Sequence, residues 1–480
     1  MQVLCEGHPQ IQRMSPGMRL VLNRPTVLDE PVLQGDSDAD ATGASIYGSV
    51  IRDQGVFRMW YQAWPRDWNG DDVITVGCVE SDDGLEWRRP AYGLVECLGS
   101  TANQLTDLPF HSPSVLVDPD AGPGQRYRAF GYTAPRKFAG RFAQTVNASG
   151  YFTAHSADGL HWTLDSLDPL WQPGDVISSV WDPAAGGARV ALKTGRFLGG
   201  MSRRAFSTAE WRQGQASAPV PALFPDELDD VAARARGFHT ADYYGVSLLP
   251  TPGPTIGFLW NFRHQLPAAQ HWSVGHYGNT GCVDLSVVYQ LERGGCWRHV
   301  PGRPDWLASR DAPEWARGGL YTASSPLEVG EETWLYFCGT VDRHGWCGVD
   351  VDYSAWSRAA HERRGFAKIG LARWVTHRII GAQADLVERL ALSARPAAEG
   401  RLALNAVTRP DGRIRVRLVG AADGKTIPGY GYEDCEPLAG DIRDRAVRWS
   451  GREALPPAPA LAEIEIERGT LYAFDFALAG

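Results

Sequence analysis

Two copies of one short sequence decide the fold of this chain. Residues Ser81–Trp87 read Ser-Asp-Asp-Gly-Leu-Glu-Trp, and 75 residues later Ser156–Trp162 read Ser-Ala-Asp-Gly-Leu-His-Trp. A weaker third copy, with Gly-Gly in place of Asp-Gly, ends the stretch Gln290–Trp297. Asp-Gly and Gly-Gly favour tight hairpin turns, and the Trp that follows can close onto a neighbouring sheet. The spacing therefore indicates repeated all-β units.

A second repeat, a pair of strands joined by a turn, occurs five times between residues 44 and 350. Each pair is rich in aromatic and β-branched residues and turns at Asp, Pro or Gly. Units of about 60–80 residues that can each supply four strands are typical of a propeller. The pattern predicts a five-bladed β-propeller, and a β-sandwich with coincidental hairpins is the alternative. The five pairs are Tyr47–Tyr61, Ser114–Tyr132, Ser178–Lys193, Tyr244–Trp260 and Tyr321–Phe337.

The last quarter of the chain has a different pattern. Polar and apolar residues alternate strictly in segments such as Gly412–Leu418 and Glu463–Glu467, as they do in half-buried antiparallel strands. We therefore expect an all-β chain with a propeller over residues 1–355 and a C-terminal β-sandwich over residues 366–480. Two short helices are expected, at Pro225–Gly237, with acids first and arginines last, and at Ser354–Gly365.

The composition excludes several classes of protein. The chain has 480 residues, 44% hydrophobic and 21% charged, which excludes a disordered or fibrous protein. Its net charge of −9 argues against a nucleic-acid partner, and the absence of long apolar runs argues against a membrane partner. The first residues lack a secretion signal, so a cytoplasmic location is expected. The 8 cysteines include no CxxC pair, and the 18 tryptophans suit sugar stacking or an all-β core.

This layout resembles the five-bladed propeller glycosidases, which include the invertase- and levanase-like families 32 and 68 and the arabinanase-like family 43. The Ser-x-Asp-Gly-Leu-x-Trp turns resemble shortened Asp boxes, which are structural signatures. Three stretches resemble a less characterised bacterial group of glycosidase-like proteins: Ser81–Gly93, Gly318–Gly339 and Lys425–Asp441. The resemblance implies a glycoside hydrolase that acts on an oligosaccharide or glycoside, furanosides included, without a cofactor or metal. The Asn-Asp-Pro signature of the fructosidases is absent from blade 1.

Glycoside hydrolysis uses one carboxylic acid to protonate the leaving oxygen and one carboxylate to attack carbon or activate water. The loops that enter the first strand of each blade converge at one mouth, so we looked for acids there. By the resemblance, Asp40 in blade 1 is the nucleophile or general base, with Asp38 in reserve. Asp175 is the acid that enters blade 3, and Asp242, which enters blade 4, is the candidate general acid. For each, a solvated or turn-capping carboxylate is the structural alternative.

Further residues at the blade entrances are candidates for substrate binding. His111 stands where the arabinanase-like enzymes carry a supporting Asp, and Arg317 could bind an anionic sugar or neutralise a carboxylate. A backbone-satisfied His or a core Trp is the alternative role for such residues. The remaining candidates are His239, His344, Asp284 and Trp60. Two other functions stay open: a catalytically silent glycan-binding propeller, and a metal-dependent propeller lactonase or lyase that uses inward His and Asp.

Overall fold

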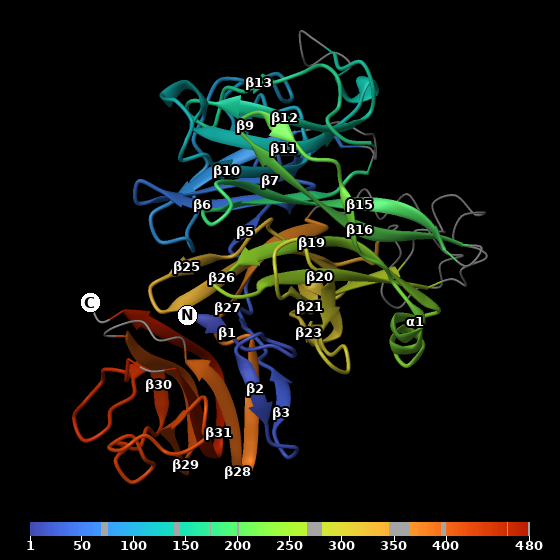
Figure 1. Cartoon of the computed structure of the whole chain (residues 1–480). Coiled ribbons are helices and arrows are strands. Elements are labelled where there is room, and N and C mark those ends of the chain that lie inside the picture. The colour runs from blue at the N-terminus through green and yellow to red at the C-terminus, as the bar shows by residue number, and fades with distance from the viewer. Residues whose placement is uncertain are drawn as a thin grey trace.

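The computed structural model describes residues 1–68, 75–138, 145–172, 174–198, 201–265, 281–344, 365–394, 400–457 and 459–478. Five antiparallel sheets follow one another along the chain and make up a five-bladed propeller, and a seven-stranded sheet lies to one side of it (Figure 1). The all-β expectation, a five-bladed propeller with a C-terminal sandwich, is confirmed.

Each blade runs from an inner first strand to an outer fourth strand. Blade 1 contains β6 (Gly43–Asp53), β7 (Val56–Trp64), β8 (Val76–Ser81) and β9 (Leu105–Thr106). Blade 2 contains β10 (His111–Val117), β11 (Tyr127–Thr133), β12 (Gly150–Ser156) and β13 (Thr163–Leu164). Blade 3 contains β14 (Ile177–Asp182), β15 (Gly187–Leu198), β16 (Met201–Arg212), β17 (Gln215–Ala216) and β18 (Val220–Leu223). Blade 4 contains β19 (Thr240–Pro250), β20 (Thr255–His264), β21 (Gly281–Gln290), β22 (Trp297–His299) and β23 (Asp305–Leu307).

Blade 5 is completed by the start of the chain. Its first strands are β24 (Gly319–Thr322), β25 (Leu327–Val329), β26 (Glu332–Thr340) and β27 (Ala367–Val375). The short strands β4 (Thr26–Val27) and β5 (Leu33–Gln34) pair with the outer side of β27. The N-terminal segment thereby closes the ring, because it supplies the outer edge of the last blade.

All five predicted strand pairs are present as the first two strands of a blade. They are β6 with β7, β10 with β11, β14 with β15, β19 with β20, and β24 with β26. The alternating apolar residues of these strands face neighbouring blades, so the core consists of rings and aliphatic side chains held between sheets.

The two Asp-box turns join blade 1 to blade 5 and blade 2 to blade 1. The Ser81 and Ser156 hydroxyls accept hydrogen bonds from the backbone N–H three residues later, at 2.8 and 2.9 Å. The turns reach a positive φ at Gly84 and Gly159. Tyr336 of blade 5 donates to the Gly84 carbonyl at 2.7 Å, and Trp60 of blade 1 donates to the Gly159 carbonyl at 2.8 Å. Each motif therefore presents a carbonyl to a buried aromatic residue of the preceding blade.

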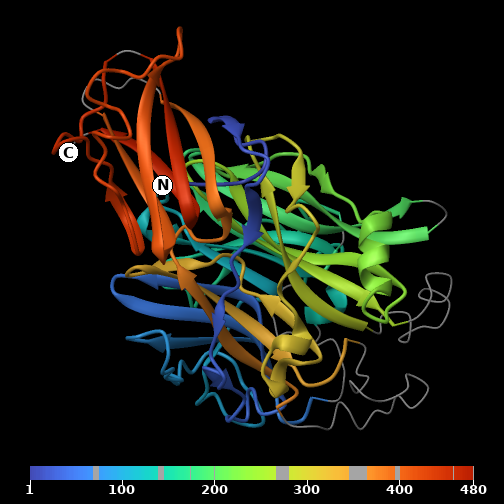
Figure 2. The same ribbon diagram turned by 90° about the horizontal axis from the view of Figure 1, so that it is seen from below.

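The C-terminal sheet also takes in the first residues of the chain. Its long strands are β28 (Ile380–Ala394), β29 (Gly400–Gly420) and β31 (Ala460–Leu478), with β30 (Asp441–Ala446) at the edge of β29. They enclose a separate apolar core, and the N- and C-terminal ends of the chain lie on this domain in both views (Figures 1 and 2). Three N-terminal strands pair with β31 and β28: β1 (Gln2–Val3), β2 (Ile11–Met14) and β3 (Arg19–Leu22).

Strand pairing therefore differs from the expected division at residues 355 and 366. Residues 2–22 pair within the C-terminal sheet, whereas β27 is the third strand of blade 5. Sequence periodicity could not show this, because pairing between the two ends of the chain leaves no local signal.

One of the two expected helices is present as predicted. Helix α1 (Glu227–Arg234) begins at a capping box in which the Asp226 carboxylate accepts from the N–H groups of Leu228 and Asp229. The other expected helix, at residues 354–365, lies outside the described residues except for Gly365.

Candidate active site

Each of the five blades places one polar or aromatic side chain in a single cluster where the inner strands begin. Tyr47, His111, Tyr244 and Tyr321 come from β6, β10, β19 and β24, and Asp175 directly precedes β14. The ring of Tyr47 lies 5.6 Å from His111 and 5.1 Å from Tyr321, and Tyr321 lies 5.8 Å from Tyr244. Sequence separations of more than sixty residues are thus brought to contact distance, as the propeller prediction required.

Irregularities in the inner strands aim these side chains. The pairing register shifts between Ser45 and Ser49 around Tyr47, between Tyr243 and Gly245 around Tyr244, and directly after His111. A β-bulge bends its strand and redirects the side chain beside it. Tyr244 therefore faces the cluster while Tyr243 turns away from it and donates to Asp229 at 2.6 Å.

Asp175 is the accessible carboxylate of the cluster. Its side chain is 44% exposed, and one carboxylate oxygen forms an ion pair with Lys193 of β15. Burial opposes ionisation, but the charges of Lys193, His111 and Arg204 outweigh it and hold the pKa of Asp175 well below its usual range. Asp175 is therefore an ionised acceptor at the channel mouth at neutral pH.

Lys193 connects the carboxylate to the aromatic rings. Its ammonium nitrogen lies 3.7 Å from the centre of the Tyr244 ring, a cation–π contact. Burial lowers the pKa of Lys193 to about 8, with Asp175 opposing the shift and Arg204 adding to it. The Tyr244 hydroxyl lies 3.0 Å from Nε2 of His344. Lys193 is therefore mostly protonated at pH 7 and loses its proton as the pH rises through about 8.

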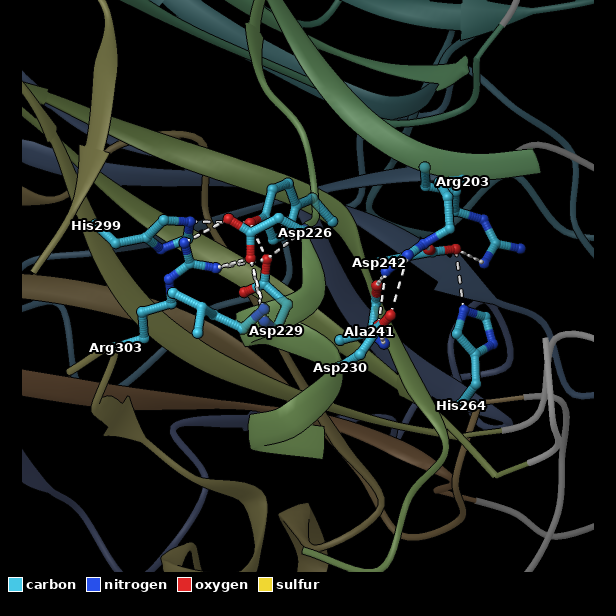
Figure 3. A network of polar contacts seen from close by, with 12 residues as sticks. Arg203, Asp226, Asp229, Asp230, Ala241, Asp242, His264, His299 and Arg303 are labelled. Carbon is cyan, nitrogen blue, oxygen red and sulfur yellow. Dashed lines mark hydrogen bonds and ion pairs between the residues drawn. The ribbon is translucent and has the colours of Figure 1, made fainter. Parts of the chain in front are cut away.

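Asp242 belongs to a buried ionic network behind the cluster (Figure 3). Its carboxylate has no exposed surface and lies 3.0 Å from Nε of Arg203, 3.4 Å from Arg204 and 2.9 Å from Nε2 of His264. Burial would raise the pKa of Asp242, but the hydrogen bond with His264 and the two guanidinium charges lower it to about 2. A general acid needs the opposite environment, so the role expected for Asp242 does not fit its surroundings.

The same network fixes helix α1 against blade 4. Arg203 also pairs with Asp230 of α1 at 2.9 Å, and the Asp230 carboxylate accepts from the Ala241 N–H at 3.1 Å. At the start of the helix, Arg303 binds both oxygens of Asp226 at 2.5 and 2.6 Å (Figure 3). The strand that carries Asp242 and Tyr244 is therefore anchored from its solvent side.

Asp40 lies within blade 1 and away from the cluster. It has no exposed surface, and its carboxylate accepts from the Ser37 N–H at 2.9 Å, the Ser37 hydroxyl at 2.7 Å and the Tyr61 hydroxyl at 2.7 Å. Gln104 and Arg89 also donate to it, each at 3.2 Å. These partners come from the inner, middle and outer parts of the same blade, so the contacts of Asp40 are those of a structural anchor.

Three other predicted binding residues are exposed outside the cluster. Asp38 is about half exposed and pairs with Arg66, and the side chains of His239 and Arg317 belong to exposed residues. None of the three has a described contact with Tyr47, Asp175 or Tyr244 among the residues that the structure describes.

Two predicted binding residues are buried in the blades. Asp284 pairs with Arg263 and accepts from the Ser309 N–H at 2.6 Å, within blade 4. Trp60 is fully buried and bonds to Gly159, so its ring cannot stack on a substrate. Of the sequence-predicted residues, the structure brings together Asp175, His111 and His344, with Asp242 joined to them through Arg204.

Sequence reasoning missed Lys193, Arg204 and the three tyrosines. Lys193 directly follows the apolar run Val190–Leu192 in the second strand of blade 3, and a cation in that position was the available signal. Arg204 lies in the third strand, a position from which we expected no contribution to the mouth.

The described residues contain neither a cluster of metal ligands nor a membrane-spanning helix. No three His, Cys, Asp or Glu side chains there are grouped as a metal site requires. No helix there is long and apolar enough to cross a membrane.

Comparison with known proteins gives likeness in structure alone, since neither protein-family models nor curated proteins match the sequence. A thermostable family-43 glycoside hydrolase aligns at a TM-score of 0.43 and 10% identity, over 70% of this chain and 91% of its own. The exo-β-1,3-galactanase of Phanerochaete chrysosporium aligns at a TM-score of 0.41 and 10% identity, over 92% of this chain and 100% of its own. The Bombyx mori GH32 β-fructofuranosidase aligns at a TM-score of 0.40 and 10% identity, over 94% of this chain and 95% of its own. Such values identify no reaction or substrate for this chain.

Proposed function

We propose that this protein is a glycoside hydrolase whose substrate binds at the channel mouth with its scissile bond beside Asp175. The observation that carries the proposal is the pairing of an accessible, ionised carboxylate with a buried lysine at the meeting point of five blade entrances. The partly exposed ring of Tyr47 offers an apolar face to a sugar ring, and the buried rings of Tyr321 and Tyr244 belong to the same cluster.

In this proposal Lys193 carries out the proton transfers and Asp175 supplies the balancing negative charge. The carbon–oxygen bond at the anomeric carbon breaks as the Lys193 ammonium gives its proton to the leaving oxygen, and the Asp175 carboxylate stabilises the positive charge that develops on the carbon. A water molecule then forms the new carbon–oxygen bond and loses its proton to the neutral Lys193 amine, so both residues end in their starting states.

The test is a screen of chromogenic furanosides and pyranosides followed by single substitutions. Asp175→Asn is expected to lower kcat on the active substrate at least a hundredfold while affinity changes little, because the amide keeps the shape but not the negative charge. Asp38→Asn is the matched control, because Asp38 is also an exposed, ion-paired acid near a blade entrance.

Two results would overturn the proposal. One is a full screen without turnover on the folded wild-type protein, which would favour a glycan-binding propeller. The other is an Asp175→Asn variant that turns over the substrate as fast as wild type.

A further inference from the structure

A pocket between blades 2 and 3 lies at the other end of the strands from the channel mouth. It has a volume of about 600 Å³, which suits one or two sugar rings. Its lining includes Trp181 at the end of β14, whereas Asp175 precedes the start of that strand. At about 3.3 Å per residue, the two are roughly 20 Å apart along the strand, so the pocket is separate from the proposed active site.

The floor of the pocket is a stacked pair from the two blades. The guanidinium carbon of Arg128 lies 4.4 Å from the centre of the Trp211 ring, and Arg128 is 5% exposed. Arg128 donates to Asp165 at 2.5 Å and, over a longer 3.4 Å, to Gln125. Its buried Nε–H has no acceptor among the described residues, so the floor retains a donor that is not used within the described protein.

The walls carry hydrogen-bond acceptors. Asp165 is 30% exposed, forms an ion pair with Arg128 and lies 2.6 Å from Nδ1 of His155. Asp168 is exposed, and one of its carboxylate oxygens accepts from Asn147 at 2.9 Å. Its second oxygen has no side-chain contact among the described residues. Trp181 is partly exposed and adds an aromatic wall. The carboxylates outnumber the single guanidinium, so an anionic ligand would be repelled.

We propose that this pocket is a second carbohydrate-binding site, which holds a neutral sugar unit of a glycan. Sugar hydroxyls donate to the exposed carboxylates of Asp165 and Asp168, and the C–H face of a pyranose or furanose fits against the partly exposed Trp181 indole. The pocket binds without cleaving, because the reacting pair Asp175 and Lys193 is at the other end of the blade. The site would keep a longer glycan bound to the protein between successive cleavages at the channel mouth.

The test is calorimetric titration of the full chain with neutral galacto-, arabino-, xylo- and fructo-oligosaccharides, and with trigalacturonate as the anionic probe. At least one neutral probe is expected to bind. Trp181→Ala is expected to weaken that binding tenfold or more, and Asp168→Asn about threefold. Trp162→Ala is the matched control, because Trp162 is a partly exposed Trp of blade 2 outside the pocket. Asp168 is exposed, so its variant keeps the test valid if Trp181→Ala does not fold.

The outcomes separate this site from the channel. Asp175→Asn is expected to keep the binding component that Trp181→Ala removes, whether or not the chain hydrolyses any glycoside. The proposal is overturned if no neutral probe binds, if both pocket variants bind as wild type does, or if trigalacturonate binds there more tightly than the neutral probes.

Discussion

The Lys193 ammonium lies between the Asp175 carboxylate and the face of Tyr244, 3.7 Å from the centre of the ring. Asp175 directly precedes β14 and Lys193 lies in β15, so the ion pair belongs to blade 3, and blade 4 supplies the Tyr244 ring from β19. Burial disfavours the charged amine more than the Asp175 carboxylate favours it, so the pKa of Lys193 is lowered to about 8. A proton donor and a negative charge therefore lie side by side at the mouth.

Turnover should depend on the protonation of Lys193. We expect kcat to fall as the pH rises through about 8, because the pKa of Lys193 lies there and only the protonated amine can donate. Lys193→Arg keeps the charge but does not release a proton, so kcat should fall about a hundredfold and the loss of activity near pH 8 should disappear. A pH series on both proteins measures this, with Lys425→Arg in the sandwich as control. An unchanged profile in Lys193→Arg would contradict the role.

Asp242 should stabilise the fold. Its pKa is lowered from 3.8 to about 2 in the folded protein, so its contribution is present above pH 4 and is lost as the pH falls toward 2. We expect Asp242→Asn to reduce the free energy of unfolding by about 3 kcal/mol at pH 7, because two guanidinium groups lose their buried partner. Urea unfolding at pH 7 and pH 3 should show a smaller difference at pH 3.

The exposed pair Arg19–Asp385 provides the comparison for that experiment. Asp385 is 51% exposed, so Asp385→Asn should change the free energy of unfolding by about 0.5 kcal/mol or less. Equal effects of the two substitutions would contradict the network described for Asp242.

Asp40 should matter for stability and not for chemistry. The Asn in Asp40→Asn presents an NH₂ group to the donors that now bind the carboxylate, so we expect a loss of about 2 kcal/mol in urea unfolding. The folded variant should keep kcat within about twofold. An Asp40→Asn protein of normal stability and abolished turnover would instead support the nucleophile role that the family resemblance implies.

We expect that only glycine fits well at position 159, because the turn needs a positive φ there and the Trp60 ring lies close to where a Cβ would be. Gly159 has φ +79°, and a Cβ would lie 2.8 Å from Cζ2 of Trp60. We expect Gly159→Ala to cost about 3 kcal/mol in urea unfolding, from backbone strain and crowding together. Gly186→Ala is the control, because Gly186 has φ +60° with no atom within 4 Å of the added Cβ, and should cost about 1 kcal/mol. Equal costs would show that the contact with Trp60 is not tight.

Local patterns were enough to predict the blades. Asp-Gly turns, aromatic strand pairs and the capping box of α1 are set by residues near in sequence, and all are present. The pattern also predicted that Asp175, His111 and His344 lie near one mouth. It could not rank the acids, because Asp40, Asp175 and Asp242 all stand at or just before the start of inner strands and differ only in the partners that the tertiary structure supplies.

By itself, the sequence determined the all-β class, five blade units and a sandwich-like C-terminal pattern, since hydrophobic alternation and turn residues act over a few positions. Only the tertiary structure decided that residues 2–22 join the C-terminal sheet, that Lys193 faces Asp175, and that Asp40 and Asp242 are enclosed. The physical reason is that burial and charge balance depend on all side chains within a few ångströms, and in a propeller those side chains come from different strands and loops.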